Sequence, residues 1–399
     1  MTKLIFSIVI LIFSTFTYLV VVSQFNLKVV PPQLETPSRQ ESKNYRGVIN
    51  VRSQRSSGSG RPEEIFRSAE AAGLDWILLT DQLGVGPRRE DLSGYHGRIL
   101  VLDGAEIPLL DNRYFVADSQ GFLGKTLSQA QLRLTELLSK KSPDPEAFVV
   151  QSETLGTWDS SEPPPGLHGI ELFNSKILAS AAWKRSKTLV FWSLFSLLAN
   201  LDLSFVRLYS DPVPALLWWD RTVQSRRLIA VAGSEASARA LPLPNWLLQF
   251  PSYEKSFGIF SNHLWIRGDL TGNASKDRAK IMDALNQGHL FMSLDLLGNP
   301  NGFQAFINQD GKSFFPGSRL GWRKNSVFFG KLKDIPRSFF EWIVYRNGER
   351  ILNSNLPQLS LPLEGPGIYR IVIRCVVSFP FPEGKRWVTW ITTNPFDVY

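Results

Sequence analysis

The sequence predicts an α/β protein with a mainly parallel sheet or barrel, preceded by one membrane-spanning helix and followed by a small all-β domain. Strand-like and helix-like segments alternate between residues 46 and 299, which is typical of βαβ units. Only strand-like segments follow beyond residue 300. Leu4 to Val22 contains no charged residue and is almost wholly apolar. These three observations divide the chain into an N-terminal helix, an α/β region and a C-terminal β region.

The apolar segment is long enough to cross a bilayer. At 1.5 Å per residue it extends about 28 Å as a helix, close to the thickness of the hydrocarbon core. We interpret residues 1–23 as a single-pass anchor; the alternative is a signal peptide cleaved near Ser23. Cleavable signals usually have a shorter apolar region, which favours the anchor. In both cases the body is expected outside the cytoplasm, either tethered to the membrane or secreted.

Residues 24–45 are predicted to be a linker, because prolines and small polar residues leave little apolar surface to bury. The predicted strands of the α/β region cover residues 47–51, 76–80, 99–102, 148–150, 169–173 and 228–232. A helix is predicted over 62–72, where Pro62 and two acidic residues form a favourable first turn. A second is predicted over 127–140 from leucines at helical spacing. Thr188 to Leu208 is predicted to be a buried helix rather than a second membrane span, because polar residues interrupt it.

The character of the sequence changes at the turn cluster 299–302. Five strand-like segments then follow, at residues 303–307, 326–331, 339–345, 369–377 and 387–392. Asn347-Gly348 is typical of a tight hairpin turn. We therefore predict one α/β domain at 46–299 and a β-sandwich domain at 300–399.

Composition and the absence of certain motifs exclude several classes of function. The net charge is +8, but the basic residues are scattered, so no nucleic-acid partner is expected. The single cysteine, Cys375, excludes an intramolecular disulfide. The sequence contains no phosphate-binding P-loop motif and no Gly-x-Ser-x-Gly nucleophile motif.

Several short motifs nevertheless occur in a recognisable order at predicted strand ends. They are Thr80-Asp81 after a strand–loop–helix beginning at Tyr45, Gly104-Ala105-Glu106, Gly169-Ile170-Glu171-Leu172-Phe173-Asn174, Gly233-Ser234-Glu235-Ala236-Ser237, the helix and strand of Ile281 to Leu296, and Trp390 to Pro395. In this order they resemble the long, membrane-anchored form of the polymerase-and-histidinol-phosphatase (PHP) family, over about residues 45–399. The resemblance implies a distorted (β/α)7 barrel, and divalent metals that activate water for phosphoester hydrolysis.

The motifs are degenerate at the positions where the family carries metal ligands. Asn50 and Arg52 stand where the family has two histidines, Ser57 aligns with a loop acid, and Gln82, Gln151 and Ser237 align with further histidines. Glu235 replaces an aspartate. Asp81 and Glu106 are unchanged, and Glu171 lies in the Gly-Ile-Glu motif. The four histidines of the chain, His96, His168, His263 and His289, fall at none of these positions.

This pattern predicts a protein without catalytic residues, metal or cofactor. A permanent cation at a ligand position repels a metal, so we expect Arg52 to pair with Glu106 or Asp81 and fill the former pocket. A second interpretation is an anion site in which Arg52 and Arg55, with neutral Asn50 and Gln82, bind phosphate or carboxylate. In either case the chain would be a membrane-tethered binding or scaffold module, with an anionic ligand or a protein as its partner.

The alternative is an active hydrolase. Asp81, Glu106, Glu171 and Glu235 would form a carboxylate-only site for Mg²⁺ or Mn²⁺, the ions that oxygen ligands suit. The two hypotheses differ in the position of one side chain. The hydrolase requires Arg52 to point away from these carboxylates, whereas the metal-free protein requires Arg52 to lie among them as a paired cation.

Overall fold

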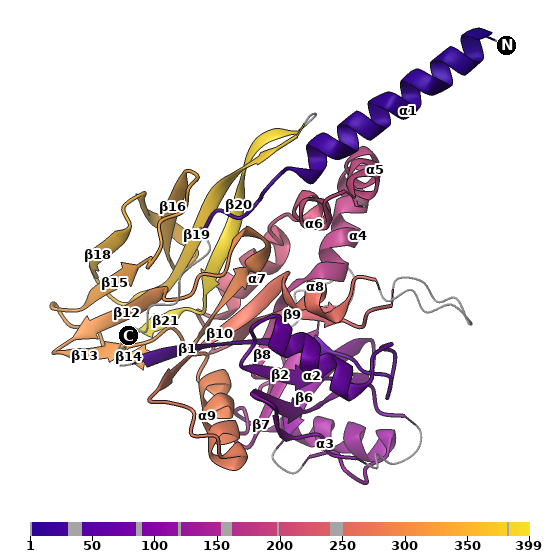
Figure 1. The fold of residues 1–399 in the computed structure, drawn as a ribbon. Coiled ribbons are helices and arrows are strands. Elements are labelled where there is room, and N and C mark those ends of the chain that lie inside the picture. The colour runs from indigo at the N-terminus through magenta and orange to yellow at the C-terminus, as the bar shows by residue number, and fades with distance from the viewer. Residues whose placement is uncertain are drawn as a thin grey trace.

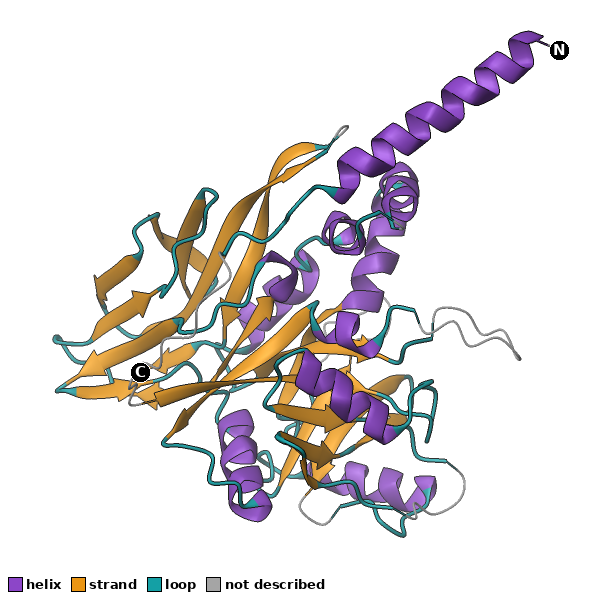
Figure 2. Ribbon diagram, viewed as in Figure 1, coloured by secondary structure: helices purple, strands orange, loops and turns teal. Residues whose placement is uncertain are grey.

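The computed structural model describes residues 2–30, 42–84, 90–118, 121–152, 162–197, 199–239, 250–380 and 383–399. It is a mixed α/β protein with one large sheet, a smaller four-stranded sheet, and a long N-terminal helix that extends away from the body (Figure 1). The predicted α/β class is therefore confirmed. Helices lie along the α/β region, whereas the C-terminal region is made of strands and loops (Figure 2).

The first strand, β1 (Ser42–Val51), organises the α/β region. It pairs in parallel with β2 (Trp76–Leu79) and β9 (Ile229–Ala236), and antiparallel with β10 (Phe260–Arg267). Pairing continues from β9 through β8 (Gly169–Asn174), β7 (Ala147–Ser152), β6 (Asn112–Asp118) and β5 (Ala105–Leu109). A bridge between Gln82 and Glu106 joins β5 to the end of β2, so the pairings return to β1. The carboxyl ends of β1, β2, β8 and β9 therefore meet at one end of a closed ring.

The strands and helices of this region follow the sequence pattern closely. Strand β4 (Ile99–Asp103), which runs into β5 through Gly104, pairs with β2 and with the short β3 (Gly94–His96). Helix α2 (Pro62–Ala71) begins at its proline and packs Ile65 and Phe66 against the sheet. Helix α3 (Leu127–Ser139) begins with a capping box in which the side chain of Thr126 accepts a hydrogen bond from the backbone of Gln129. Both helices are confirmed.

The hairpin of β5 and β6 was not predicted, and it makes part of the ring antiparallel. Strand β5 contains Pro108, a residue that is normally confined to edge strands, strand starts or bulges. The turn has Leu110 at φ 53°, where a glycine or asparagine would be expected. Strand β10 was also missed. The remaining elements of this region are α7 (Val213–Thr222), α8 (Tyr253–Phe257), α9 (Ala274–Asn286), β11 (Leu290–Leu294) and the turn η1 (Asp295–Leu297).

The prediction of one buried helix at residues 188–208 is wrong. After α4 (Ser175–Arg185), the chain forms α5 (Lys187–Ser196) and α6 (Leu201–Leu208). The side chain of Asn200 accepts a hydrogen bond from the backbone of Leu203 and so caps a new helix. Phe191 on α5 is largely exposed rather than buried.

The predicted linker is shorter than residues 24–45. Leu27, Val29 and Val30 are buried. The backbone of Val29 accepts a hydrogen bond from Arg337 and donates one to Leu297. At the other end, β1 already begins at Ser42. The segment after α1 (Thr2–Ser23) is therefore fastened to the body up to residue 30; residues 31–41 lie outside the described residues.

The C-terminal strands continue the large sheet. Strand β11 pairs with β20 (Gly384–Thr393), which pairs with β19 (Gly367–Phe379), so hydrogen bonds cross the predicted boundary at residue 299. The other strands that join the large sheet here are β14 (Arg319–Leu320), β16 (Phe340–Arg346), β17 (Glu349–Ser354) and β21 (Phe396–Val398). The smaller sheet has β13 (Lys312–Phe314), β12 (Gln304–Gln309), β15 (Val327–Lys331) and β18 (Gln358–Pro362) in that order. Trp342 packs between the two sheets against Gly330, where a side chain would not fit.

The predicted hairpin turn is confirmed. Strands β16 and β17 are joined by Asn347 at φ 54° and Gly348 at φ 83°. These positive values are those of a type I′ turn, which Asn-Gly adopts with little strain.

Candidate functional site

Six of the predicted site residues lie at or near the strand ends that meet in the ring. Asn50 is in β1 and Arg52 follows it; Asp81 follows β2; Glu106 is in β5; Glu171 is in β8 and Glu235 in β9. Asn50 and Glu235 have positive φ angles of 65° and 48°, a conformation that non-glycine residues seldom adopt. Such strained positions are found most often at functional sites.

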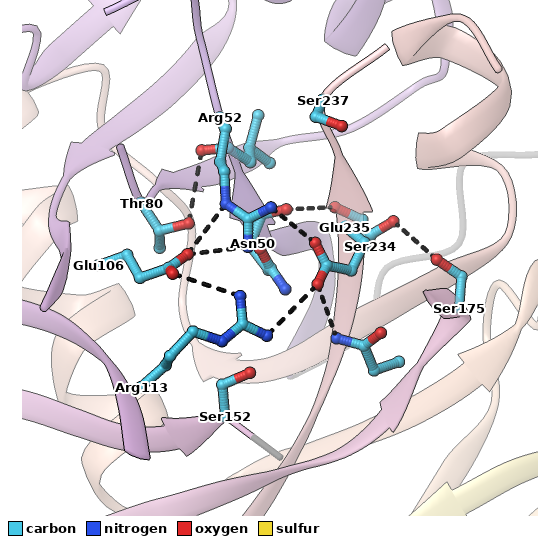
Figure 3. Close-up of polar contacts among 12 residues, drawn as sticks. Asn50, Arg52, Thr80, Glu106, Arg113, Ser152, Ser175, Ser234, Glu235 and Ser237 are labelled. Atoms are coloured by element: carbon cyan, nitrogen blue, oxygen red, sulfur yellow. Dashed lines mark hydrogen bonds and ion pairs between the residues drawn. The ribbon is translucent and has the colours of Figure 1, made fainter. Parts of the chain in front are cut away.

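Arg52 lies between two of the carboxylates (Figure 3). Its Nε donates a hydrogen bond to Glu106 Oε2 at 2.9 Å. Its Nη2 and Nη1 form ion pairs with Glu106 Oε2 at 2.8 Å and with Glu235 Oε2 at 2.9 Å. Arg52 is 7% exposed and Glu106 is fully buried. Burial opposes the charge of Arg52, but Glu235 and Glu106 outweigh it, so the pKa of Arg52 is raised.

A second arginine, which no motif predicted, reaches the same two carboxylates. Arg113 of β6 lies 3.3 Å from Glu106 Oε1 and 3.7 Å from Glu235 Oε1. Its side chain is 25% exposed, so it lies nearer to solvent than Arg52. Gln82 also donates to Glu106 Oε1, at 2.9 Å. Two guanidinium groups therefore face two carboxylates, as Figure 3 shows.

Arg55 and Asp81 belong to a neighbouring cluster. Arg55 binds Asp81 Oδ2 at 3.0 Å and Asp103 Oδ1 at 2.8 Å. Asp81 also accepts hydrogen bonds from the backbone and hydroxyl of Ser53 and from the hydroxyl of Ser56, each at 2.6 Å. Burial opposes the charge of Arg55, but Asp103 and Asp81 outweigh it and raise its pKa. Asp103 was not predicted, because it ends a strand without any recognised motif.

Glu171 has hydrogen-bond donors but no ion pair among the described residues. Asn50 Nδ2 donates to its Oε1 at 2.8 Å, and the Ser152 hydroxyl donates to its Oε2 at 2.5 Å. Burial, and then the nearby charge of Glu235, raises the pKa of Glu171 to about 7. The carboxylate lies against the backbone of Gly233, where an added Cβ would come within 1.6 Å of Oε1. Gly233 therefore leaves the space that Glu171 occupies.

The remaining predicted residues lie at the edge of this site. Gln151 donates a hydrogen bond to Asn112 rather than to the carboxylates. Ser237 contributes its backbone carbonyl, which accepts from Ser59 and from the hydroxyl of Tyr253, and its side chain points away from Arg52 (Figure 3). Ser57 is half-buried in the loop that follows Arg52.

The donor set fits a divalent metal poorly. Oxygens of Glu106 and Glu235 that a metal would need are bound by Arg52 and Arg113. Within the described ranges, no three or more His, Cys, Asp and Glu residues are grouped so as to hold a metal ion. His168 contacts the backbone of Val149 and Asp144, and the other three histidines likewise contact residues outside the site.

A separate buried polar network, also missed from the sequence, lies where β1, β10 and β11 meet. Arg46 pairs with Asp295 at 2.5 Å, and Asp295 accepts a hydrogen bond from Ser261 at 2.7 Å. His263 Nε2 lies 2.9 Å from the hydroxyl of Ser261 and 3.1 Å from that of Ser293. The combination of serine, histidine and aspartate resembles a hydrolytic triad, but both serines are buried and no substrate could reach them. The network therefore fastens the three strands together.

No protein-family model and no curated protein matches the chain. Among solved structures, it is similar to a two-domain protein from Bacteroides vulgatus that contains a predicted PHP-like metal-dependent phosphoesterase. That protein is 11% identical, the match covers 90% of this chain and 98% of that one, and the TM-score is 0.39. The residues of this chain, and not the neighbour, carry the function proposed below.

Proposed function

We propose that this chain is a metal-independent binding or scaffold protein built on a degenerate PHP-like scaffold and tethered to a membrane by α1, with its body outside the cytoplasm. The observation that carries the proposal is the position of Arg52. Its guanidinium group bridges Glu106 and Glu235 from within the ring, which is the arrangement that the metal-free hypothesis requires. The degenerate motifs and their order in the sequence supply the family assignment.

The ion pairs of the two clusters favour a filled pocket over an anion site. The charged groups of the two clusters are the arginines Arg52, Arg55 and Arg113 and the carboxylates Asp81, Asp103, Glu106 and Glu235. Among the described residues, each of these arginines already pairs with at least one carboxylate. An incoming phosphate or carboxylate would have to displace these carboxylates from the arginines, and their negative charges would repel it. The binding function is therefore assigned to the outer surface of the protein, with a protein partner, and not to this pocket.

The proposal is tested by metal content and turnover together. The full chain, purified in detergent and incubated with Mn²⁺, Zn²⁺ or Mg²⁺, should retain no stoichiometric metal by elemental mass spectrometry. It should also fail to hydrolyse a generic phosphomonoester and a generic phosphodiester. Stoichiometric Mn²⁺ or Mg²⁺ with turnover that Glu106→Gln abolishes would establish the hydrolase alternative instead. Arg98→Met, which removes an exposed arginine far from the ring's carboxylates, is the matched control.

A further inference from the structure

Helix α5 is inverted relative to an ordinary surface helix. Its exposed face carries Phe191, Leu194 and Phe195, which are 62%, 56% and 41% exposed. Its buried face carries Ser193 and Ser196. A surface helix of a globular protein normally turns its apolar side inward and its polar side toward water. The exposed face of α5 is therefore built for an apolar environment.

The hydroxyl groups of the buried serines form hydrogen bonds with neighbouring residues, so the orientation of α5 leaves these groups paired. The Ser193 hydroxyl donates to the backbone carbonyl of Ser204 at 2.6 Å. Ser196 exchanges a hydrogen bond with the Ser204 hydroxyl at 3.1 Å and accepts one from Arg207 Nη1 at 2.9 Å. Arg207 is fully buried and also pairs with Glu383 at 2.8 Å. These polar contacts fix which face of α5 points outward.

Further contacts hold α5 and α6 against the end of α1. The ring of Tyr18 lies 5.2 Å from that of Trp192 and 5.4 Å from that of Phe195. The Tyr18 hydroxyl accepts a hydrogen bond from Arg207 at 3.3 Å. Asn200 donates to the backbone carbonyls of Val22 and Phe25 at 3.2 and 2.7 Å. Figure 1 shows α5 beside the body-proximal end of α1, with α3 at the opposite end of the molecule.

With α1 crossing a bilayer as proposed above, α5 would lie at the edge of that bilayer. Helix α1 is the one helix within the described part of the chain that is long and apolar enough to cross a membrane. Tyr18 is five residues before the end of α1 at Ser23, or about 8 Å at the rise of an α-helix. Interfacial helices bury their apolar face to a depth of about 5–10 Å at the boundary between head groups and acyl chains. The level of α5 along α1 matches that depth.

The residues around the apolar face are those that favour the head-group layer. Trp183 is 46% exposed, and the ammonium group of Lys187 lies over its ring at 5.9 Å. Lys184 and Arg185 are exposed at the end of α4. Tryptophan is enriched at membrane interfaces, and basic side chains are attracted to anionic lipid head groups. The apolar face and its basic edge thus fit one partner, the surface of a bilayer that contains anionic lipid.

We propose that α5 is a second membrane contact, which inserts Phe191, Leu194 and Phe195 into the interface of the bilayer that α1 crosses. This inference rests on the proposed membrane tether. It deepens that proposal, because two contacts fix the orientation of the body on the membrane, whereas a single helix would let the body rotate and tilt.

The test places an environment-sensitive fluorophore at single cysteines in the full chain, reconstituted into vesicles of phosphatidylcholine and phosphatidylglycerol. Cys375 does not interfere, because it is buried and burial raises the pKa of its thiol to about 12. Phe191→Cys is the test position and Leu194→Cys a second one. Leu132→Cys, on an exposed position of α3 that is 72% accessible, is the matched control. Ile12→Cys, near the middle of α1, reports the anchor itself.

Lipids with a nitroxide high in the acyl chain should quench the labels at 191 and 194 several-fold more than the label at 132. Lipids with a nitroxide deep in the chain should quench the label at 12. Quenching at 12 with none at 191 and 194 would overturn this inference and leave the membrane tether standing. Loss of quenching at all of these positions would overturn the tether, and the second contact with it.

Discussion

Replacing Arg52 by methionine should destabilise the protein strongly. Methionine keeps much of the packing volume but removes the charge, which leaves two carboxylates without their main cation. Glu106 is fully buried and the side chain of Glu235 is 7% exposed. Removing one partner of a buried ion pair typically costs about 3–5 kcal/mol, because the remaining charge has no solvent to stabilise it. We expect about 3 kcal/mol, the lower end, because Arg113 still reaches both carboxylates at 3.3 and 3.7 Å.

The free energy of unfolding is measured by urea denaturation of the full chain in detergent, followed by tryptophan fluorescence. Arg98→Met is the control. Arg98 pairs with Glu70 at 3.3 Å, but the two side chains are 63% and 47% exposed, and such a surface pair contributes only about 0–1 kcal/mol. Adding Glu106→Gln to Arg52→Met should recover part of the loss, with a coupling energy of about 2 kcal/mol.

The reasoning fails if Arg52→Met costs no more than Arg98→Met. That result would mean that the carboxylates do not depend on Arg52 for their charge balance. It would fail in a second way if Arg52→Met gained stoichiometric Mn²⁺ without losing stability, because the arginine would then only be blocking a metal site that is otherwise intact.

Three further outcomes follow from the same contacts. Burial is the main reason that the pKa of Glu171 is raised to about 7. The stability that this raised pKa contributes is therefore present below the unfolded-state pKa near 4.5 and is lost as the pH rises toward 7. Glu171→Gln should flatten the pH dependence of the free energy of unfolding, measured in urea, by up to about 1.4 kcal/mol per pH unit in that window. Burial opposes the charge of Asp295, but Arg46 and the hydrogen bonds to Asp295 outweigh burial and lower the pKa of Asp295. Asp295→Asn should therefore reduce the free energy of unfolding by about 3–5 kcal/mol at pH 7 and by progressively less as the pH falls below about 4. Equal losses at pH 7 and below pH 4 would contradict this. Gly233→Ala should cost at least about 1–3 kcal/mol by overpacking against Glu171, and Glu171→Ala should relieve that strain, so strictly additive losses in the double variant would refute the close approach.

The sequence identified Arg52, Glu106 and Glu235 as candidates for one site through short motifs that resemble those of the PHP family. The carboxyl ends of neighbouring parallel strands share one edge of a sheet, so polar residues just past such ends are neighbours. This rule accounts for the proximity of Arg52 and Glu235, which lie at the ends of the paired parallel strands β1 and β9. The favourable first turn was sufficient to predict α2, and leucines at helical spacing were sufficient for α3. The Asn-Gly pair was sufficient for the turn between β16 and β17.

Arg113 could not be predicted, for a reason that lies in the chain around it. It is carried by the hairpin of β5 and β6, whose turn has Leu110 at a positive φ instead of a glycine or asparagine. Pro108 further weakens the strand pattern. Without the hairpin, no rule brings a residue of β6 to the ends of β1 and β9. The exposed face of α5 was missed for a related reason: its apolar composition was interpreted as burial within the protein, and only the contacts of its serines show which side faces outward.

The close association of acids and arginines at these strand ends has a physical explanation. Buried carboxylates at converging strand ends need a cation, since isolated charges in such a place are strongly disfavoured. Here guanidinium groups supply that charge: each donates several hydrogen bonds in a fixed plane and stays charged at every physiological pH. The neutral side chains of Asn50 and Gln82 add hydrogen bonds to the carboxylates of Glu171 and Glu106. The acids and the arginines are then one charge-balanced unit, so substitutions among them should be judged as a set and not position by position.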